Sequence, residues 1–513
     1  MLELLEWGKK RGDETADPGS DAGPAGAALA GLGDTDPSTA LGELSARLEA
    51  ASGGEAFALI QDAGAAHVSA LFTQYFVGDA GTHAAREATW KSLVNYQSRL
   101  AQVLCESAGA LLTAQSAVRA LGACRMLAKL HLVHYASVPG KLWRAAYSIH
   151  ASAEKVGCAT TPVHARSGHR ATTTAEHELL RLLMLRVSAP DMMAPEQIEV
   201  TDRVVEQLGA EFTLRQPGVA DNPFSFEPER EFPPRRAKGR EPSATARYFG
   251  PGMGYDSLER VARQLGAARH EEFKAFGKDI APRVQLSAVQ HLLTFWRTDC
   301  PYAPPAHSPA SGTLQVVHGY GQLLQYLSQA HEVPRELSLA VAQVAAPQAP
   351  ETWELRGTGG NELGAEVAPQ SGNWVKCGEL VGVSVRDGGE RWVGMIRRMH
   401  AAPEGRARAD IAVLSQEPRE VSLRAVIGEY DDSAFSDASS RQFAGNTVHA
   451  IILADGASGT QPANLLLPPS EWQENRIYEV QAKEGSRYLR SLQAVRRGED
   501  YVRATFEWLS ESG

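Results

Sequence analysis

The pattern in this sequence that most resembles a metal-binding site is a pair of histidines. His131 and His134 stand three apart in a stretch of helical spacing, so a helix would place both imidazoles on one face. No acidic third ligand stands nearby in the sequence, and packing or surface roles are therefore favoured. A looser group follows at spacings that match no zinc site: Cys158, His164, His169 and His177. We expect no bound metal.

Motifs for catalysis are equally incomplete. The His-Glu pairs at His177, His270 and His331 all lack the second histidine of a zinc-protease helix. The glycines between Gly357 and Gly364 are not followed by the Lys-Ser or Lys-Thr of a phosphate-binding loop, so a β-turn is the better interpretation. No G-x-S-x-G elbow occurs. The sequence therefore predicts a non-catalytic protein without a cofactor.

Length, charge and cysteine content narrow the class of protein. The chain has 513 residues, which is enough for roughly three domains that each bury a core. Its 5 cysteines are scattered and form no C-x-x-C motif, which fits reduced thiols in a cytoplasmic protein. The net charge of -10 argues against a nucleic-acid polymer as partner. No apolar run reaches the roughly 18 residues of a spanning helix, so we expect no membrane span.

The N-terminal half is expected to be helical after a flexible start. Residues 1–40 are rich in Gly, Ala, Asp and Pro, which predicts a disordered leader. From 41 to 209, apolar residues recur at spacings of three and four, as they do at Leu93, Tyr96, Leu100 and Val103, which predicts a helical bundle. Helices are expected through 56–76, 114–135, 142–156 and 175–185, and the threonines 172–174 offer an N-cap for the last. Residues 210–252 are rich in Pro and Arg and are expected to form an exposed linker.

The C-terminal half changes to strand patterns. Residues 253–345 are expected to be a mixed segment, with helices near 286–296 and 322–327 and a strand at 313–317. Residues 346–430 are expected to form an antiparallel barrel, and 431–513 a small C-terminal β domain. The strand candidates of that last domain are 448–453, 464–467, 477–482, 487–494 and 501–508.

The clearest local pattern predicts a four-strand β meander. Its strands are expected at Gly378–Val385, Arg391–Arg398, Ala409–Leu414 and Glu420–Leu423. In the first of them, valines alternate with Gly382 and Ser384, as one buried face requires. Asp387-Gly388-Gly389 carries the turn chemistry of a hairpin between the first two strands.

Several short pieces together resemble a PilZ-type barrel. They are Trp353-Glu354-Leu355, Gly357-Thr358-Gly359-Gly360, Leu363-Gly364-Ala365, the run Cys377 to Val383 and the run Trp392 to Arg397. PilZ domains are bacterial receptors for the second messenger cyclic di-GMP. The whole arrangement is similar to long proteobacterial proteins of that superfamily, with a helical N-terminal half and a degenerate PilZ-like barrel. The resemblance covers about residues 285 to 510.

The resemblance also implies a ligand site. In PilZ receptors an R-x-x-x-R segment ahead of the barrel clamps phosphates and guanine edges, and a D/N-x-S-x-x-G segment completes the pocket. Here the clamp region, Trp296 to His307, holds one arginine, and the second motif is echoed only by Arg356 to Gly360, without the acid and the serine. The implied ligand-binding residues are Arg297, Arg356, Thr358, Gly360 and Arg397.

The basic residues of the expected linker have two interpretations. Arg235, Arg236 and Arg240 are either a solvated tether, or they fold over the barrel and supply the missing phosphate contacts. Arg397 and Arg398 are adjacent on an expected strand, so only one of them can face a pocket.

These observations predict a multidomain α+β protein, with an N-terminal all-α helical bundle, a PilZ-like antiparallel β-barrel and a small C-terminal β unit. The expected function is that of a non-catalytic receptor or regulator in the cyclic di-GMP pathway. The alternative is a ligand-independent adaptor, whose degenerate barrel binds no ligand and whose helical half binds a protein partner. A third hypothesis is an enzyme on a different fold. Arginines that converge near the open end of the barrel would favour the receptor, whereas an acidic or apolar surface would favour the adaptor.

Overall fold

The computed structural model describes residues 35–78, 82–166, 171–216, 222–237, 245–267, 276–302, 307–328, 349–368, 374–385, 390–427, 442–453, 463–482 and 485–509. The chain divides into two compact units, Met1–Ala303 and Pro304–Gly513. Most of the expected leader lies outside the described residues, as does the expected Asp387-Gly388-Gly389 turn. No helix of the described part is long and apolar enough to cross a membrane.

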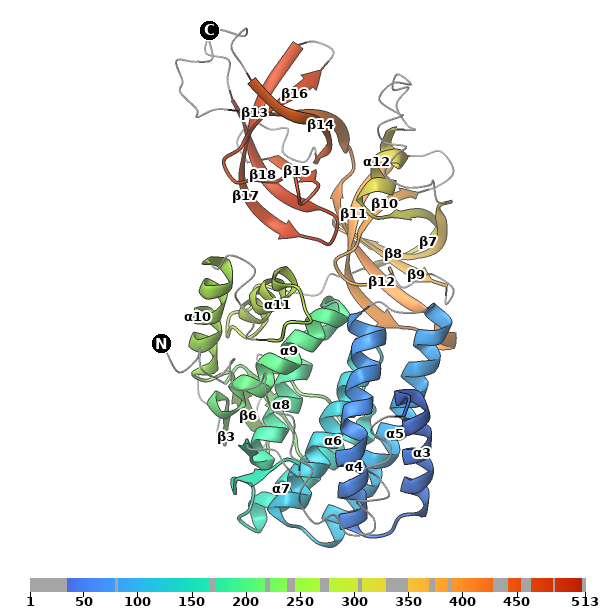
Figure 1. The fold of residues 1–513 in the computed structure, drawn as a ribbon, viewed down its shortest axis with the longest axis vertical. Coiled ribbons are helices and arrows are strands. Elements are labelled where there is room, and N and C mark those ends of the chain that lie inside the picture. Colours follow the sequence, from blue (N-terminus) through green and yellow to red (C-terminus); the bar gives the residue numbers. More distant parts are fainter. Residues whose placement is uncertain are drawn as a thin grey trace. The chain divides into compact units, whose positions relative to one another are not determined.

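Helices dominate the N-terminal unit, and the predicted ones are confirmed (Figure 1). They are α3 (Pro37–Ala50), α4 (Gly54–Phe72), α5 (His83–Ala110), α6 (Ala114–Val133), α7 (Gly140–Lys155), α8 (Ala175–Val187), α9 (Pro195–Leu208), α10 (Gly254–Ala267) and α11 (Pro282–Phe295). Shorter turns are η1 (Thr73–Val77), η2 (Pro190–Met192) and η3 (Gly209–Glu211).

Hydroxyl side chains begin several of these helices. Thr174, one of the predicted caps, accepts a hydrogen bond from the backbone N–H of His177 at the start of α8. Thr113 and Ser116 form a reciprocal capping box at the start of α6. These caps satisfy backbone donors that have no partner inside the helix, so they define where each helix begins.

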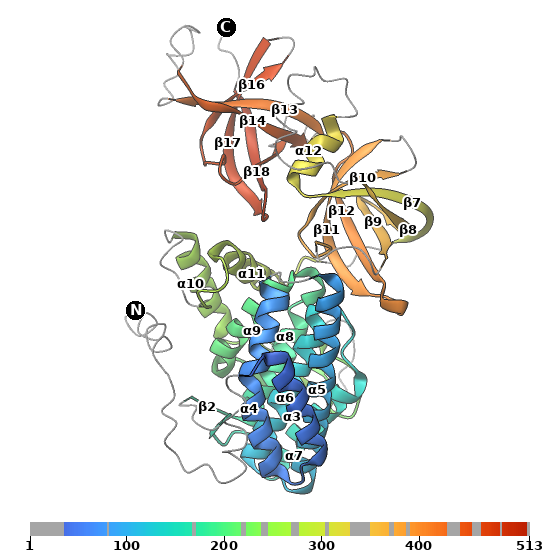
Figure 2. The same ribbon diagram turned by 45° about the vertical axis from the view of Figure 1, so that its right-hand side comes forward.

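Helix α6 lies at the centre of the N-terminal core. It packs against α5, α7, α8 and α9, and Figure 2 shows α4, α5 and α6 running alongside one another. Thirteen of its side chains are buried, from Ala117 to Val133, including Arg119 and Lys129. A helix buried on so many sides must neutralise its internal charges with partners from its neighbours.

The segment expected to be an exposed linker forms part of this unit. It contains the strands β3 (Thr213–Arg215), β4 (Phe224–Phe226), β5 (Arg235–Arg236) and β6 (Arg247–Gly250), in the sheet order β3-β6-β4-β5. Phe224 and Phe249 are 1% and 0% exposed and belong to the core. The structure therefore differs from the linker expectation, because the aromatic residues gain more from burial than the Pro- and Arg-rich stretch loses by ordering. A two-stranded pairing joins β1 (Val163–His164) to β2 (Thr172–Thr173).

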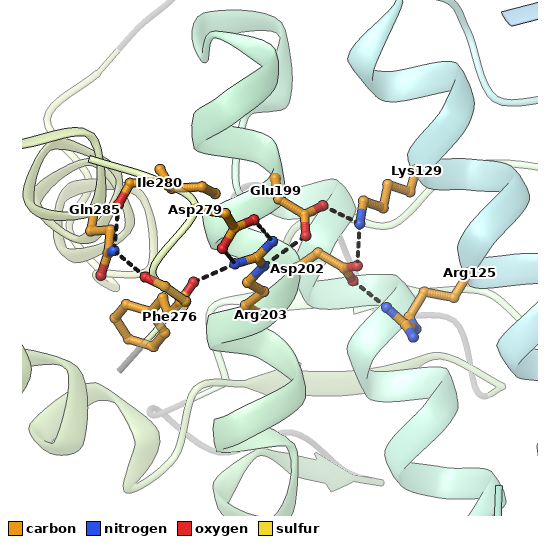
Figure 3. A network of polar contacts seen from close by, with 10 residues as sticks. Arg125, Lys129, Glu199, Asp202, Arg203, Phe276, Asp279, Ile280 and Gln285 are labelled. Carbon is orange, nitrogen blue, oxygen red and sulfur yellow. Dashed lines mark hydrogen bonds and ion pairs between the residues drawn. The ribbon is translucent and has the colours of Figure 1, made fainter. Parts of the chain in front are cut away.

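A network of buried and half-exposed ion pairs connects α6 with α9 and the segment before α11 (Figure 3), and Glu178 extends it to α8. Asp202 of α9 accepts hydrogen bonds from Arg125 and from Lys129, the latter at 2.8 Å. Glu199, one turn earlier, pairs with Lys129 and with Arg203. Arg203 in turn binds both carboxylate oxygens of Asp279 at 2.7 and 2.6 Å.

The electrostatics of this network are balanced. Burial alone would raise the pKa of Asp202, but the charges of Arg125 and Lys129 outweigh it, so the pKa lies below its ordinary value of 3.8. Four cations, Arg125, Lys129, Arg181 and Arg203, meet four carboxylates, Glu178, Glu199, Asp202 and Asp279. The network therefore tethers helices and leaves no charge over for a ligand.

The strands of the C-terminal unit form closed barrels within the described residues. The first has the order β10-β11-β12-β9-β8-β7 and the second the order β13-β14-β15-β18-β17-β16. The first uses β7 (Ser308–His318), β8 (Glu351–Gly359), β9 (Glu362–Val367), β10 (Leu380–Val385), β11 (Arg391–Ala401) and β12 (Ala407–Ser415). The second uses β13 (Arg419–Ile427), β14 (Gln442–Leu453), β15 (Ala463–Leu467), β16 (Ile477–Ala482), β17 (Gly485–Arg497) and β18 (Val502–Leu509).

The predicted meander is right for three strands and wrong for the fourth. β10, β11 and β12 pair in sequence, as expected. β13, which contains the expected fourth strand Glu420–Leu423, pairs instead with β14 and β16 of the second barrel. The first barrel closes through β7 and β9, strands that precede the meander, so its edges are already occupied.

Helix α12 (Tyr320–Ser328) and its neighbours join the two barrels. An apolar cluster combines Leu323 of α12 and Leu380 of the first barrel with Ile451, Leu466 and Tyr501 of the second barrel. The Tyr320 hydroxyl donates to the His449 carbonyl at 2.6 Å, and the Tyr320 backbone N–H donates to Asp500 at 2.5 Å. We call this junction the barrel seam.

Candidate functional site

Arg297, the predicted clamp residue, lies just after α11 in the N-terminal unit. Its Nε and Nη2 atoms donate to the Asp299 carboxylate at 3.0 and 2.9 Å. That pairing lowers the pKa of Asp299. The guanidinium is half exposed, so a ligand could reach it only in competition with Asp299.

One of the expected linker arginines, Arg236, lies close to Arg297. Arg236 donates to the Arg297 carbonyl at 2.8 Å and to the Phe295 carbonyl, and its guanidinium lies 5.0 Å from the centre of the Phe224 ring. Arg235 pairs with Glu227 at 2.8 Å. Arg240 lies outside the described residues. The structure thus brings Arg236 and Arg297 together, but through a backbone carbonyl that occupies one of the guanidinium nitrogens.

Arg356 and its neighbours lie on the first barrel. Arg356, on β8, donates to Glu366 at 2.8 Å and to Glu354 at 2.5 Å. Arg406 binds the same two carboxylates at 2.7 and 2.8 Å. Two guanidinium groups and two carboxylates therefore form a closed cluster on the barrel surface, in which each charge already has partners.

The remaining predicted residues lie at the β8–β9 hairpin. Thr358 is exposed near the end of β8, and Gly360 takes a φ of +56° in the turn that follows. A turn at this position confirms the β-turn interpretation of the glycines, since a positive φ favours glycine. Arg397 of β11 reaches Glu362, the first residue of β9, at 2.7 Å.

An acidic group surrounds Arg397. The Nδ1 atom of His307 lies 3.8 Å from an Asp410 oxygen, and its Nε2 atom lies 3.9 Å from a Glu362 oxygen. Both the Nε2 of His307 and the second oxygen of Glu362 are buried without a hydrogen-bond partner in the described structure. Over this side of the barrel the carboxylates of Glu354, Glu362, Glu366 and Asp410 lie among Arg356, Arg397 and Arg406, and Arg398 and Arg408 are the strand partners of Asp410 and Glu366.

The histidines singled out by their spacing have structural partners. The His134 ring stacks on Trp90 at 4.0 Å, and its Nε2 lies 2.8 Å from Glu87. His131 meets the same tryptophan edge-on. His169 lies outside the described residues. In the described part of the chain, no group of three or more His, Cys, Asp or Glu side chains is arranged to hold a metal ion.

Sequence reasoning missed two arginines at the barrel seam. Arg496 of β17 and Arg503 of β18 are direct partners across the strand pair. Arg503 stands in the expected strand 501–508, whereas Arg496 lies two residues beyond the expected strand 487–494, which the structure extends to Arg497. The sequence does not show that these two arginines lie opposite each other. Their pairing depends on the β17–β18 register, which is shifted by irregularities between Ser491 and Arg496.

A comparison with protein families gives one finding about this chain. Residues 25–218 match the family model described as the N-terminal domain of the cyclic-di-GMP receptor FimW. Searches of curated proteins and of solved structures gave no match. The matched residues include helices α3 to α9 and the strands β1 to β3. Over residues 25–218 this chain is thus similar to the N-terminal domain of the cyclic-di-GMP receptor FimW, which confirms its resemblance to receptors of the cyclic di-GMP type.

Proposed function

We propose that this chain is a non-catalytic receptor or regulator in cyclic di-GMP signalling and that it acts in the cytoplasm. The observation that carries the proposal is the match of residues 25–218 to the N-terminal domain of a cyclic-di-GMP receptor. The C-terminal barrels support it, because the PilZ-like resemblance also lies in that half. Cyclic di-GMP carries two phosphodiester charges and two guanines, so its receptor needs guanidinium groups that pair with phosphate.

The resemblance assigns ligand contacts to Arg297, Arg356, Thr358, Gly360 and Arg397, with Arg235, Arg236 and Arg240 as further phosphate contacts. The described arginines of this set all have internal partners. Ligand phosphate would have to replace Glu354 or Glu366 at Arg356, and Asp299 at Arg297. Exposed ion pairs contribute little to stability and exchange readily, so this replacement is open to a dianionic ligand.

Isothermal titration of the full chain with cyclic di-GMP at moderate salt tests the proposal. We expect saturable binding at micromolar or lower concentration, and no binding of GMP under the same conditions. The Arg297→Ala and Arg356→Ala variants report whether the implied site takes part. A flat titration from protein that unfolds cooperatively on heating would remove the receptor assignment.

The second candidate function is a ligand-independent adaptor that binds a protein partner through the helical half. It is favoured by the internal partners of Arg356, Arg397 and Arg406, whose guanidinium groups already bind the carboxylates of Glu354, Glu362 and Glu366. A dianion can bind these arginines only by displacing the carboxylates. The titration separates the two functions, because the adaptor predicts no heat with cyclic di-GMP at any protein concentration that stays folded.

A further inference from the structure

Two arginines face each other on the outer side of the second barrel. Arg496 of β17 and Arg503 of β18 are register partners, and like charges directly opposite each other destabilise a strand pair. Six residues earlier on β17, Arg490 faces Glu507 and binds it at 3.1 Å. The same two strands therefore pair one arginine with a carboxylate and place two others against each other.

Neither arginine of the opposed pair has a carboxylate partner. Among the described residues, Arg503 donates from Nε to the amide oxygen of Asn464 at 3.1 Å, and the Arg496 side chain makes no hydrogen bond or ion pair. Burial is the main cause that lowers the pKa of the Arg503 guanidinium, Tyr501 raises it in part, and the charge of Arg496 adds a smaller lowering. The pair is thus a concentration of unneutralised positive charge.

The pair lies at the barrel seam. A Cβ atom at Gly378, which precedes β10 of the first barrel, would lie 2.7 Å from Nη2 of Arg496, so the guanidinium rests directly over this glycine. The hydroxyl of Tyr501 donates to the Gly378 carbonyl at 3.1 Å and holds the two segments together. Lys376, two residues before Gly378, adds a third cation, which lies 3.6 Å from Glu499.

The nearby carboxylates do not neutralise the arginines. Asp500 is held by the backbone N–H of Tyr320, and Glu499 pairs with Lys376. Burial raises the pKa of Tyr501, and the charges of Glu379 and Asp500 raise it further. An anion that bound here would meet two guanidinium groups from adjacent strands, at the spacing of one strand pair.

We propose that Arg496 and Arg503 form an anion site at the barrel seam that binds the phosphodiester groups of a cyclic dinucleotide. The identity of the ligand rests on the proposed function. Guanidinium groups bind phosphate oxygens through paired hydrogen bonds, and the ligand charge would remove the repulsion between the two arginines. Because Lys376 and Gly378 belong to the first barrel and the arginines to the second, the ligand would contact both.

The test is titration of the full chain and of three single variants with cyclic di-GMP. Arg496→Ala and Arg503→Ala should each weaken binding by roughly tenfold or more, the effect of losing a charge-assisted hydrogen bond. Arg490→Ala removes the same charge from the same strand and should leave the affinity within about twofold, since its arginine is already paired. Thermal unfolding of Arg496→Ala and Arg503→Ala should be unchanged or shifted upward, because a repulsion is removed.

The outcomes separate this inference from the proposed function. Binding that is weakened by Arg356→Ala, but not by Arg496→Ala or Arg503→Ala, would overturn the seam site and keep the receptor. If wild-type protein binds no cyclic di-GMP, the receptor assignment and the ligand identity both fail. Inorganic phosphate then tests the anion site alone. If phosphate raises the melting temperature of the wild type but not that of Arg503→Ala, the anion site is supported. If phosphate does not raise the melting temperature of the wild type, the anion site is rejected.

Discussion

Replacing Asp202 by asparagine gives the sharpest test of what holds the helical unit together. The substitution preserves the shape of the side chain and removes its charge. Asp202 is 9% exposed in its side chain and accepts from both Arg125 and Lys129. After the change, four buried or half-buried cations would face three carboxylates, Glu178, Glu199 and Asp279.

The expected cost follows from the burial of the partners. The side chains of Arg125 and Lys129 are 12% and 6% exposed. Breaking a buried ion pair by removing one partner costs about 3–5 kcal/mol, because the charge left behind remains out of water. In a domain of this size, such a loss lowers the melting temperature on the order of 10 °C.

Thermal unfolding followed by far-ultraviolet circular dichroism measures this change, since the helices supply most of the signal. Asp299→Asn is the matched control, because it makes the same chemical change in an exposed pair with Arg297. We expect the control to unfold as the wild type does. If Asp202→Asn melts within about 2 °C of the wild type, the network does not carry the stability assigned to it.

Three further predictions concern the network and the barrels. The stability that Asp202 contributes is present above its ordinary pKa of 3.8 and is lost as the pH falls below it, so the melting temperature should drop with acid in the wild type and less steeply in Asp202→Asn. In β10, a methyl group at Gly382 would lie 2.8 Å from Leu323 Cδ1, so Gly382→Ala should cost about 1–3 kcal/mol in urea unfolding, and an unchanged midpoint would contradict the packing. At the barrel seam, Tyr320→Phe leaves the His449 carbonyl without this donor, so the free energy of unfolding of the C-terminal unit should fall by about 1–3 kcal/mol, which urea unfolding measures.

Element type was largely readable from the sequence because it depends on local periodicity. Helical spacing predicted α5 through Leu93, Tyr96 and Leu100, all of which are buried. Alternation in 380–385 predicted β10, where Val381 and Val383 are buried. The five strand candidates after residue 440 each fall on a strand of the second barrel.

The sequence did not show which domain each of these elements belongs to. Glu420–Leu423 has the same alternation whether it completes one barrel or starts the next, and closure of the first barrel by β7 decides between the two. Phe224 and Phe249 come from a stretch whose composition indicates a linker, but they are buried once β4 and β6 pair. Both outcomes depend on contacts between residues far apart in the chain.

The same limit applies to the site. Composition and spacing by themselves determined that arginine was available and that metal and nucleophile motifs were incomplete. Only the tertiary structure decided which arginines are neutralised, because a guanidinium is paired by whichever carboxylate the fold brings near it. Arg356 meets Glu366 across a hairpin and Glu354 along its own strand, whereas Arg503 meets Arg496 across another hairpin. Charge pairing is set by strand register, and register is a property of the folded barrel.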